Sequence, residues 1–356
     1  MKIAIGLSGG VDSSVAALLL KRAGHDVTGV MMALWPSGQA AAVKRSGCYG
    51  PNEAEDIRVA REVCQIIGIP FFLFDCSAGY EDMVLRYFRD EYRSGRTPNP
   101  CVRCNEKVKF GLLPCAARDA GLLFDRFATG HYARIERDPQ SGRYLLKKAR
   151  DERKDQSYFL YRLSQDQLRG ALFPLGELAK DDVRRIARES GLPVYDRKES
   201  QDFYGGDLKD ILRQDDKPGD IVNGQGTVLG SHRGVWNYTV GQRKGLGIAS
   251  GTRLYVTAVD AERNRLIVGP EHEARRRSCL VTRCNWIACE TLEVPTAALV
   301  KIRSSGIPLP AGLTPLDDRS VLINFAKPVA AVTPGQSAVF YRDDLVLGGG
   351  NIQRAE

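Results

Sequence analysis

Short apolar runs alternate with stretches of helical periodicity over the first two hundred residues. Four runs have the length and composition of buried strands, at residues 2–6, 26–32, 71–74 and 123–129. Between them, apolar side chains recur at helical spacing over 11–23, 52–67 and 80–92. This alternation predicts a doubly wound parallel sheet, in which ligands bind at the carboxyl ends of the strands.

The pattern changes in the second half of the chain. Residues 164–190 predict one helical stretch, whereas from residue 217 onward short β-type runs alternate with glycine and proline. Runs of this length and spacing are typical of small β-rich modules or barrels. We therefore expect an α/β domain followed by β-rich domains.

Composition supports a folded soluble protein. The chain has 356 residues, of which 43% are hydrophobic and 26% charged, which is enough for two or three domains and argues against disorder. Because no run of about 18 apolar residues occurs, no membrane span is expected. The net charge of +8 favours a polyanionic partner such as nucleic acid. Nine cysteines without a dense framework fit the reducing cytoplasm.

The first motif lies between the first predicted strand and the first predicted helix. Residues 6–14 read Gly-Leu-Ser-Gly-Gly-Val-Asp-Ser-Ser. Glycines let the backbone approach a phosphate, hydroxyls add donors, and the start of a helix adds aligned N–H groups. Asp12 is suited to hold Mg²⁺ on the anionic groups. A glycine–serine turn with Asp12 as a helix cap is the plain structural interpretation, but the whole string after a strand favours pyrophosphate binding.

The second motif is a pair of thiols three residues apart, Cys101 and Cys104. Prolines stiffen the loop before them, and the basic side chains of Arg103, Lys107 and Lys109 are expected to lower the thiol pKa values. A lone C-x-x-C fits a redox or sulfur-transfer pair, half of a zinc site, or coincidence. No second C-x-x-C supports a zinc ribbon. Five other cysteines are expected to be structural: Cys64, Cys76, Cys279, Cys284 and Cys289.

Three polar strings complete the set of motifs. They are Ala-Thr-Gly-His-Tyr at 128–132, Lys-Asp-Gln-Ser-Tyr at 154–158 and Gly-Gln-Arg-Lys-Gly-Leu-Gly at 241–247. A lone histidine is usually structural, but His131 directly follows a strand at the ligand edge of the sheet. The basic pair at 243–244 is either a phosphate clamp or an exposed turn.

Together these strings resemble the tRNA-specific 2-thiouridylases, PP-loop enzymes that thiolate the wobble uridine of certain tRNAs. The resemblance runs nearly end to end, through GLSGGVDSS, GRTPNPCVRCNEKVKF, ATGHYAR, KDQSYFLY, LFPLGEL, GQRKGLGI and PVAAVTPGQSAVFY. It implies a PP-loop ATP-pyrophosphatase domain over 1–203, a small β-rich central domain over 204–273 and a C-terminal tRNA-binding β-barrel over 274–356. In the implied reaction, ATP adenylates the C2 oxygen of the uridine, and a cysteine-borne sulfur displaces AMP.

The resemblance also implies which residues form the site. ATP would contact Gly6, Leu7, Ser8, Gly9, Gly10, Val11, Asp12, Ser13, Met32 and Gly130. The tRNA would contact His131, Lys154, Asp155, Gln156, Arg303, Ser304 and Gln336. The segment around Arg303 reads KIRSSGIPLP and departs from the family's usual aromatic and basic spelling.

The sulfur chemistry departs from the family pattern at two positions. Cys101 stands where the family usually has Asp, and Tyr204 stands where it usually has the persulfide-carrying cysteine. Two routes remain open. In one, Cys101 and Cys104 form a persulfide–disulfide pair: one thiol bears the persulfide, and the other attacks it to release sulfide. The sulfur donor of the enzyme is expected to be a persulfide carrier protein or sulfide. In the other, the two thiols ligate a 4Fe-4S cluster, with Cys48 as the nearest guess for a third ligand.

Two other functions compete with thiolation. A different PP-loop enzyme, activating a carboxylate or urea-type acceptor with ATP, would explain the first motif but not the C-x-x-C. An RNA-binding protein with a degenerate nucleotide site would explain the charge, but the intact loop with Asp12 and Ser13 speaks against it.

Overall fold

The computed structural model describes residues 1–35, 47–197 and 202–356. Its backbone contacts divide the chain into two compact units. The first unit comprises Met1–Val84, Cys101–Asp207 and Asp344–Val346. The second comprises Leu85–Pro100, Leu208–Asp343 and Leu347–Glu356. Each unit is described here by itself.

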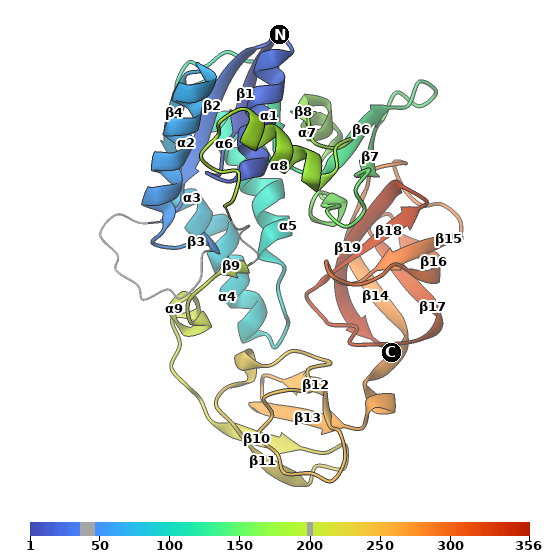
Figure 1. The fold of residues 1–356 in the computed structure, drawn as a ribbon. Coiled ribbons are helices and arrows are strands. Elements are labelled where there is room, and N and C mark those ends of the chain that lie inside the picture. Colours follow the sequence, from blue (N-terminus) through green and yellow to red (C-terminus); the bar gives the residue numbers. More distant parts are fainter. Residues whose placement is uncertain (36–46, 198–201) are drawn as a thin grey trace. The chain divides into compact units, whose positions relative to one another are not determined.

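A parallel sheet of five strands forms the centre of the first unit (Figure 1). Its strands lie in the order β4 (Phe71–Asp75), β2 (Asp26–Ala33), β1 (Lys2–Gly6), β5 (Arg126–Thr129) and β8 (Ala171–Leu172). From β1 the chain adds strands first on one side and then on the other, so the strand order reverses between β1 and β5. In a parallel sheet, such a reversal opens a crevice at the carboxyl ends of the two strands. The predicted fold class is confirmed.

Three helices pack together against this sheet: α1 (Val11–Arg22), α2 (Glu53–Ile67) and α8 (Lys180–Glu189). Their buried apolar faces meet Ile3 and Ile5 of β1 in one core, where Val15 and Val63 are fully buried. The helix α2 ends at Gly68, whose φ of 73° is the left-handed conformation that glycine adopts without steric cost. Because α1 is held along its length by this core, its first turn is fixed at the crevice.

The helical stretch expected at 164–190 is interrupted. It consists of α7 (Gln165–Gly170), the short strand β8 and α8. A capping box between Ser164 and Gln167 starts α7, and β8 then pairs with β5 as the edge of the sheet. Two residues of strand carry too short a pattern to be seen in the sequence, so the prediction of one continuous helix was wrong.

Other helical segments differ from expectation in detail. Residues 77–93 form α3 (Ser77–Tyr80), a π-helical segment η1 (Glu81–Leu85) and α4 (Arg86–Arg93). A second such stretch runs through α5 (Pro100–Cys104), the π-helical η2 (Asn105–Leu112) and α6 (Leu113–Asp119). The C-x-x-C therefore lies on a helical turn, whereas the sequence suggested a loop.

Smaller elements complete the first unit. Two short parallel strands, β3 (Gly47–Tyr49) and β9 (Asp202–Tyr204), pair with each other. An antiparallel hairpin joins β6 (Ala133–Arg137) to β7 (Tyr144–Lys148), and the 3-10 turn η3 (Ser157–Phe159) follows it.

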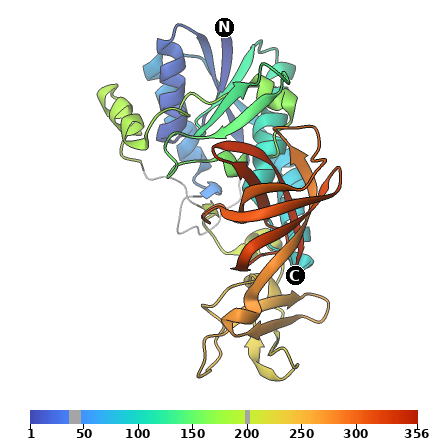
Figure 2. The ribbon, with the colours of Figure 1, turned by 90° about the vertical axis from the view of Figure 1, so that its right-hand side faces the viewer.

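The second unit contains two β modules. A four-stranded sheet has the order β11 (Val228–His232), β10 (Gly219–Val222), β13 (Arg265–Gly269) and β12 (Tyr255–Asp260). Six further strands close into a barrel, orange to red in Figure 2, because β14 pairs with both β17 and β19. They are β14 (Arg275–Trp286), β15 (Thr296–Lys301), β16 (Leu309–Asp317), β17 (Ser320–Ala330), β18 (Ser337–Arg342) and β19 (Leu345–Ala355). Short helical turns accompany them: α9 (Leu208–Leu212), η4 (Val235–Asn237) and η5 (Glu271–Ala274). The expected β-rich second half is confirmed.

Among the described residues, no helix is both long enough and apolar enough to cross a membrane.

Candidate active site

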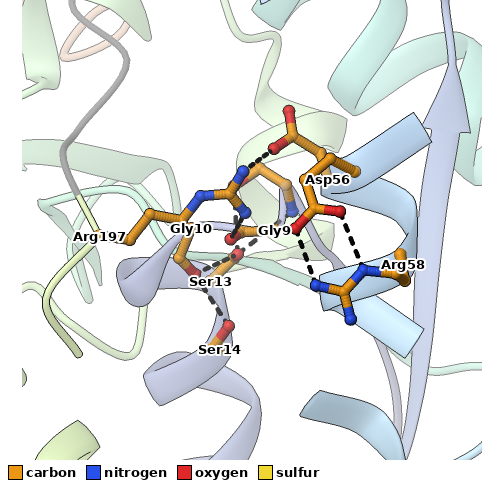
Figure 3. A network of polar contacts seen from close by, with 9 residues as sticks. Gly9, Gly10, Ser13, Ser14, Asp56, Arg58 and Arg197 are labelled. Atoms are coloured by element: carbon orange, nitrogen blue, oxygen red, sulfur yellow. Dashed lines mark hydrogen bonds and ion pairs between the residues drawn. The ribbon is translucent and has the colours of Figure 1, made fainter. Parts of the chain in front are cut away.

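The loop after β1 is pinned to the first turn of α1 by its own hydroxyls. The backbone N–H of Ser8 donates to Ser13 Oγ at 3.2 Å, and the hydroxyls of Ser13 and Ser14 both donate to the Gly10 carbonyl, at 3.2 and 2.8 Å. Gly9 adopts a left-handed φ of 69°, which favours glycine. Figure 3 shows this network around Gly9 and Gly10. These contacts fix the backbone between strand and helix in one conformation.

A pocket opens above this loop, at the crevice between β1 and β5. Seven residues predicted to contact ATP line it: Gly6, Leu7, Ser8, Asp12, Ser13, Met32 and Gly130. Of the other three, Val11 is turned into the core and is 3% exposed, while Gly9 and Gly10 form the loop itself without lining the pocket. Residues from β1, β2 and β5 thus meet at one place, as expected for a parallel sheet.

Asp12 has two hydrogen-bond donors that the sequence did not suggest. Its Oδ1 accepts from the Tyr132 hydroxyl at 2.8 Å and from Lys180 Nζ at 2.6 Å. The Lys180 side chain is only 6% exposed. A buried ammonium group is stable only beside a negative charge, so the Asp12 carboxylate stabilises the charged side chain of Lys180 behind the pocket. Mg²⁺ is usually held by one or two carboxylates together with substrate phosphates. The single carboxylate of Asp12 fits that kind of site.

Gly130 is required by close packing. A Cβ atom at this position would lie 2.6 Å from Ser13 N and 2.7 Å from the carbonyl carbon of Asp12. Both atoms belong to the backbone, so no side-chain rotation can relieve the clash. The end of β5 therefore contacts the start of α1 directly, and only glycine allows that contact.

His131 also lines the pocket, next to Lys109. Its Nδ1 lies 2.8 Å from Thr129 Oγ1, and its ring lies near those of Phe110 and Phe173. Burial, together with the charge of Lys109, holds the pKa of His131 well below its ordinary value. The imidazole is therefore neutral at physiological pH.

The Lys-Asp-Gln string divides between two roles. Gln156 lines the pocket, and its Oε1 accepts from Tyr132 N at 2.9 Å. The carboxylate of Asp155 instead accepts from the backbone N–H groups of Ala149 and Ser157, both at 3.1 Å, so it holds the local turn. Lys154 is not among the residues that line the pocket.

The remaining residues predicted to bind tRNA lie in the second unit. Arg303 donates to the carbonyl of Ala331 at 2.8 Å, and Ser304 is exposed. The amide of Gln336 donates to the carbonyls of Thr97 and Pro98, at 3.1 and 2.9 Å. Within this unit, Gln336 thus fixes the segment that leads into the C-x-x-C.

The thiols of Cys101 and Cys104 are not activated by their basic neighbours, so that prediction was wrong. Burial raises the pKa of Cys101 to about 12 and that of Cys104 to about 11, although the charge of Lys109 acts in the opposite direction. Arg103 donates to the Met83 carbonyl at 3.1 Å, and Lys107 forms an ion pair with its neighbour Glu106 at 2.9 Å. Closeness in sequence did not bring these charges to the sulfurs.

Cys48 lies close enough to the pair to interact with it electrostatically. A charge on Cys48 raises the pKa values of Cys101, Cys104 and the buried Tyr80. Cys48 itself is exposed on β3. Nevertheless, within residues 1–35, 47–197 and 202–356, no three His, Cys, Asp or Glu side chains are grouped as metal ligands.

The other cysteines are mainly buried. Cys64, Cys76, Cys279 and Cys284 are buried, and Cys289 is half-buried. Burial raises the pKa of Cys64 to about 12 and that of Cys76 to about 11. Cys64 packs within the apolar core of the first unit, which agrees with the structural role expected for it.

Comparison with known proteins places the chain in a family. A family model described as "tRNA methyl transferase HUP domain" matches residues 1–204. Models described as "tRNA methyl transferase PRC-barrel domain" and "Aminomethyltransferase beta-barrel domain" match 208–270 and 276–352. The tRNA-specific 2-thiouridylase of Endomicrobium trichonymphae is 48% identical over 356 residues, covering 99% of both chains. That of Clostridium acetobutylicum is 43% identical over 359 residues, with the same coverage. The chain belongs to the tRNA-specific 2-thiouridylase family.

This member of the 2-thiouridylase family carries an aromatic side chain at a position where a cysteine was expected. Tyr204 is buried on β9, directly opposite Tyr49 of β3, with ring centroids 6.2 Å apart. Tyr49 stacks in turn on Tyr80, with centroids 5.3 Å apart. A Cβ atom on Gly206 would lie 2.5 Å from the Tyr204 ring, so that glycine makes room for the tyrosine.

Three residues at the candidate site were not predicted from the sequence. Tyr132 and Lys180 contact Asp12, and Arg197 contacts the loop at Gly9. Lys180 lay within the helical stretch predicted over 164–190, and Arg197 followed that stretch without a motif around it. Only Tyr132 had a signal, because it directly follows His131 in a string already singled out.

Proposed function

We propose that this protein is a tRNA-uridine 2-sulfurtransferase. It uses ATP to adenylate the C2 oxygen of the wobble uridine and then replaces AMP with sulfur to give 2-thiouridine. The observation that carries this proposal is the composition of the pocket. Lys109 lines the same pocket as the loop and Asp12, and its charge also acts on the thiols of Cys101 and Cys104. Activation and sulfur delivery are therefore adjacent.

In the first step, the loop and the start of α1 bind the pyrophosphate part of ATP. The N–H groups of a helix's first turn have no acceptor within the helix and are directed at the anion. Mg²⁺, held by Asp12, would neutralise charge on the phosphates. Lys180 adds a second positive charge at Asp12. The neutral His131 and Gln156, on the pocket wall, would meet the tRNA.

In the second step, Cys101 and Cys104 act as a pair. One thiol carries a persulfide, and the other attacks its inner sulfur, which forms the Cys101–Cys104 disulfide and releases hydrosulfide. Hydrosulfide attacks C2 of the adenylated uridine, and the C2–O bond to AMP breaks. A cellular dithiol then reduces the disulfide. The outer sulfur of the persulfide comes from a persulfide carrier protein. Sulfide as the donor would instead attack C2 of the adenylated uridine directly, without a persulfide on either thiol and without formation of the disulfide.

A 4Fe-4S cluster on Cys48, Cys101 and Cys104 is the second route. The charge of Cys48 acts on both other thiols, which indicates that the three lie near one another and supports this route. Thiolates are the usual ligands of such clusters. The side chains are not grouped as metal ligands in the part of the chain that is described, so we derive no step through a cluster. Iron and sulfide analysis of anaerobically purified protein distinguishes the routes, since a colourless, iron-free protein active at full rate excludes the cluster.

The two halves of the chain divide the work in this proposal. Residues 1–203 activate the base and the barrel at 274–356 binds the tRNA, with the small central domain at 204–273 between them in the sequence. Affinity for tRNA would fall steeply with salt, because Lys and Arg displace counterions from phosphates. No disulfide bond joins cysteines within the described residues, which fits the cytoplasm.

The decisive experiment is nucleoside mass spectrometry of tRNA from cells that lack the protein. We expect 2-thiouridine to disappear and to return when the wild-type gene, but not Cys104→Ala, is supplied. Unchanged 2-thiouridine would refute the proposal. The competing function, ATP-dependent activation of a carboxylate or urea-type acceptor, would instead leave AMP formation independent of tRNA.

A further inference from the structure

The loop after β1 is hydrogen-bonded to the side chain of Arg197, which is distant in the sequence. Arg197 Nη1 donates to the carbonyl oxygen of Gly9 at 2.7 Å. Its Nη2 forms an ion pair with Asp56, in the first turn of α2. Figure 3 shows the guanidinium of Arg197 between Gly9 and Asp56. One planar group therefore joins the loop to a helix of the core.

This contact determines the orientation of one peptide group. In a trans peptide, the C=O and the N–H point in opposite directions across the plane. Because Arg197 binds the Gly9 carbonyl, the N–H of Gly10 is directed away from Arg197. Gly10 is the residue that caps the start of α1, where N–H groups have no acceptor within the helix. Arg197 thus orients the N–H group of Gly10 at the anion-binding end of α1, although Arg197 itself lies on the opposite side of the peptide.

The packing behind Gly9 leaves this peptide little freedom. A Cβ atom on Gly9 would lie 2.7 Å from the Asp56 carbonyl oxygen and 3.1 Å from Arg197 Nη1. The side chains of Arg197 and Asp56 are 31% and 25% exposed, so water competes for them only in part. Burial raises the pKa of Asp56, and the charge of Arg197 opposes that shift. The charged form of the Asp56 carboxylate therefore depends on Arg197.

We propose that Arg197 is a positioning residue for the pyrophosphate part of ATP, acting through the Gly9–Gly10 peptide and held by Asp56. This inference rests on the proposed use of ATP at the loop. It predicts a selective effect, because Arg197 contacts the loop at Gly9 and is not among the residues that line the rest of the pocket. Ligands that carry a pyrophosphate should depend on Arg197, whereas AMP should not.

The test is isothermal titration of the full-length protein with Mg·ATP, pyrophosphate and AMP. For Arg197→Met we expect Kd for ATP and pyrophosphate to rise about tenfold, the usual effect of losing a hydrogen bond from a charged group. We expect Kd for AMP to stay within twofold. Arg197→Lys should recover part of the loss, since an ammonium can reach one partner but lacks the fork that binds both.

Arg58 supplies the matched control. It lies on α2 beside Asp56, but it pairs with the exposed Glu55 and Glu62, so Arg58→Met should leave all three affinities unchanged. Wild-type affinities in Arg197→Met would overturn the proposal. So would equal weakening of AMP and pyrophosphate, because that pattern marks a general structural role. If the wild-type protein itself binds neither ATP nor pyrophosphate, the proposed function fails, and this inference fails with it.

Discussion

Adding one methyl group at Gly130 should reduce catalysis by a predictable amount. The new Cβ would lie 2.6 Å from Ser13 N, whereas ordinary contacts begin near 3.4 Å. The start of α1 must therefore move by several tenths of an ångström. The helix cannot slide as a whole, because Val15 and Ala16 are fully buried in the core. Overpacking of this kind costs about 1–3 kcal/mol.

The displaced atoms belong to the proposed phosphate and Mg²⁺ site. Misplacing reacting groups by about an ångström can cost about 100-fold in rate. For Gly130→Ala we expect kcat/KM for tRNA-dependent AMP formation to fall about 10- to 100-fold, measured by pyrophosphate release. The melting temperature should fall by several degrees.

The control is Gly170→Ala, at the end of α7, where a Cβ atom would meet nothing within 4 Å. That variant should keep wild-type activity and stability. If Gly130→Ala matched it in both measurements, the close contact between β5 and α1 would not be what places the site.

Three further outcomes are expected. Lys180→Met leaves the Asp12 carboxylate without its cation, so AMP release should fall at least tenfold and unfolding should cost about 1–3 kcal/mol less, as measured by denaturant titration. Cys101→Ala and Cys104→Ala should each abolish thiolation by nucleoside mass spectrometry while sparing ATP binding, and an active Cys101→Ala enzyme would contradict the paired mechanism. Burial lowers the pKa of His131, so below about pH 6.5 the imidazole is protonated in the unfolded chain but remains neutral in the folded protein. The stability of the folded protein should therefore decrease as the pH is lowered through that range. His131→Gln should flatten the profile of melting temperature against pH between about pH 7.5 and 5.5.

The parts of the fold visible in the sequence were those with local signals. The strands that carry the pocket are apolar runs in the sequence, so the carboxyl ends of these strands were expected to form the ligand edge of the sheet. Ser8, Met32 and Gly130 lie there. In a parallel sheet these strand ends lie at the same edge, so no further signal in the sequence is needed to predict that the residues there meet. The loop itself was equally clear, because its glycines and hydroxyls act on neighbours within five residues.

What was missed depends on distant pairing. Lys180 and Arg197 reach their partners across 168 and 188 positions, respectively, and nothing in their own surroundings marks them. The thiol pKa values were misjudged for the related reason that Arg103 and Lys107 are neighbours of the cysteines in sequence but are engaged elsewhere. Local patterns find the elements, whereas charge pairing inside a site needs the tertiary structure.

The aromatic packing at Tyr204 determines what a cysteine at this position would cost. The substitution Tyr204→Cys would remove a buried ring from beside Tyr49, and the loss of a buried aromatic side chain typically costs about 3–5 kcal/mol. Gly206 has no Cβ to fill the space, so the cavity would remain unless that residue changed as well. A thiol at position 204 is therefore not a neutral exchange in this fold: it needs a second change that refills the space beside Tyr49, and a single Tyr204→Cys substitution would weaken the pairing of β3 with β9.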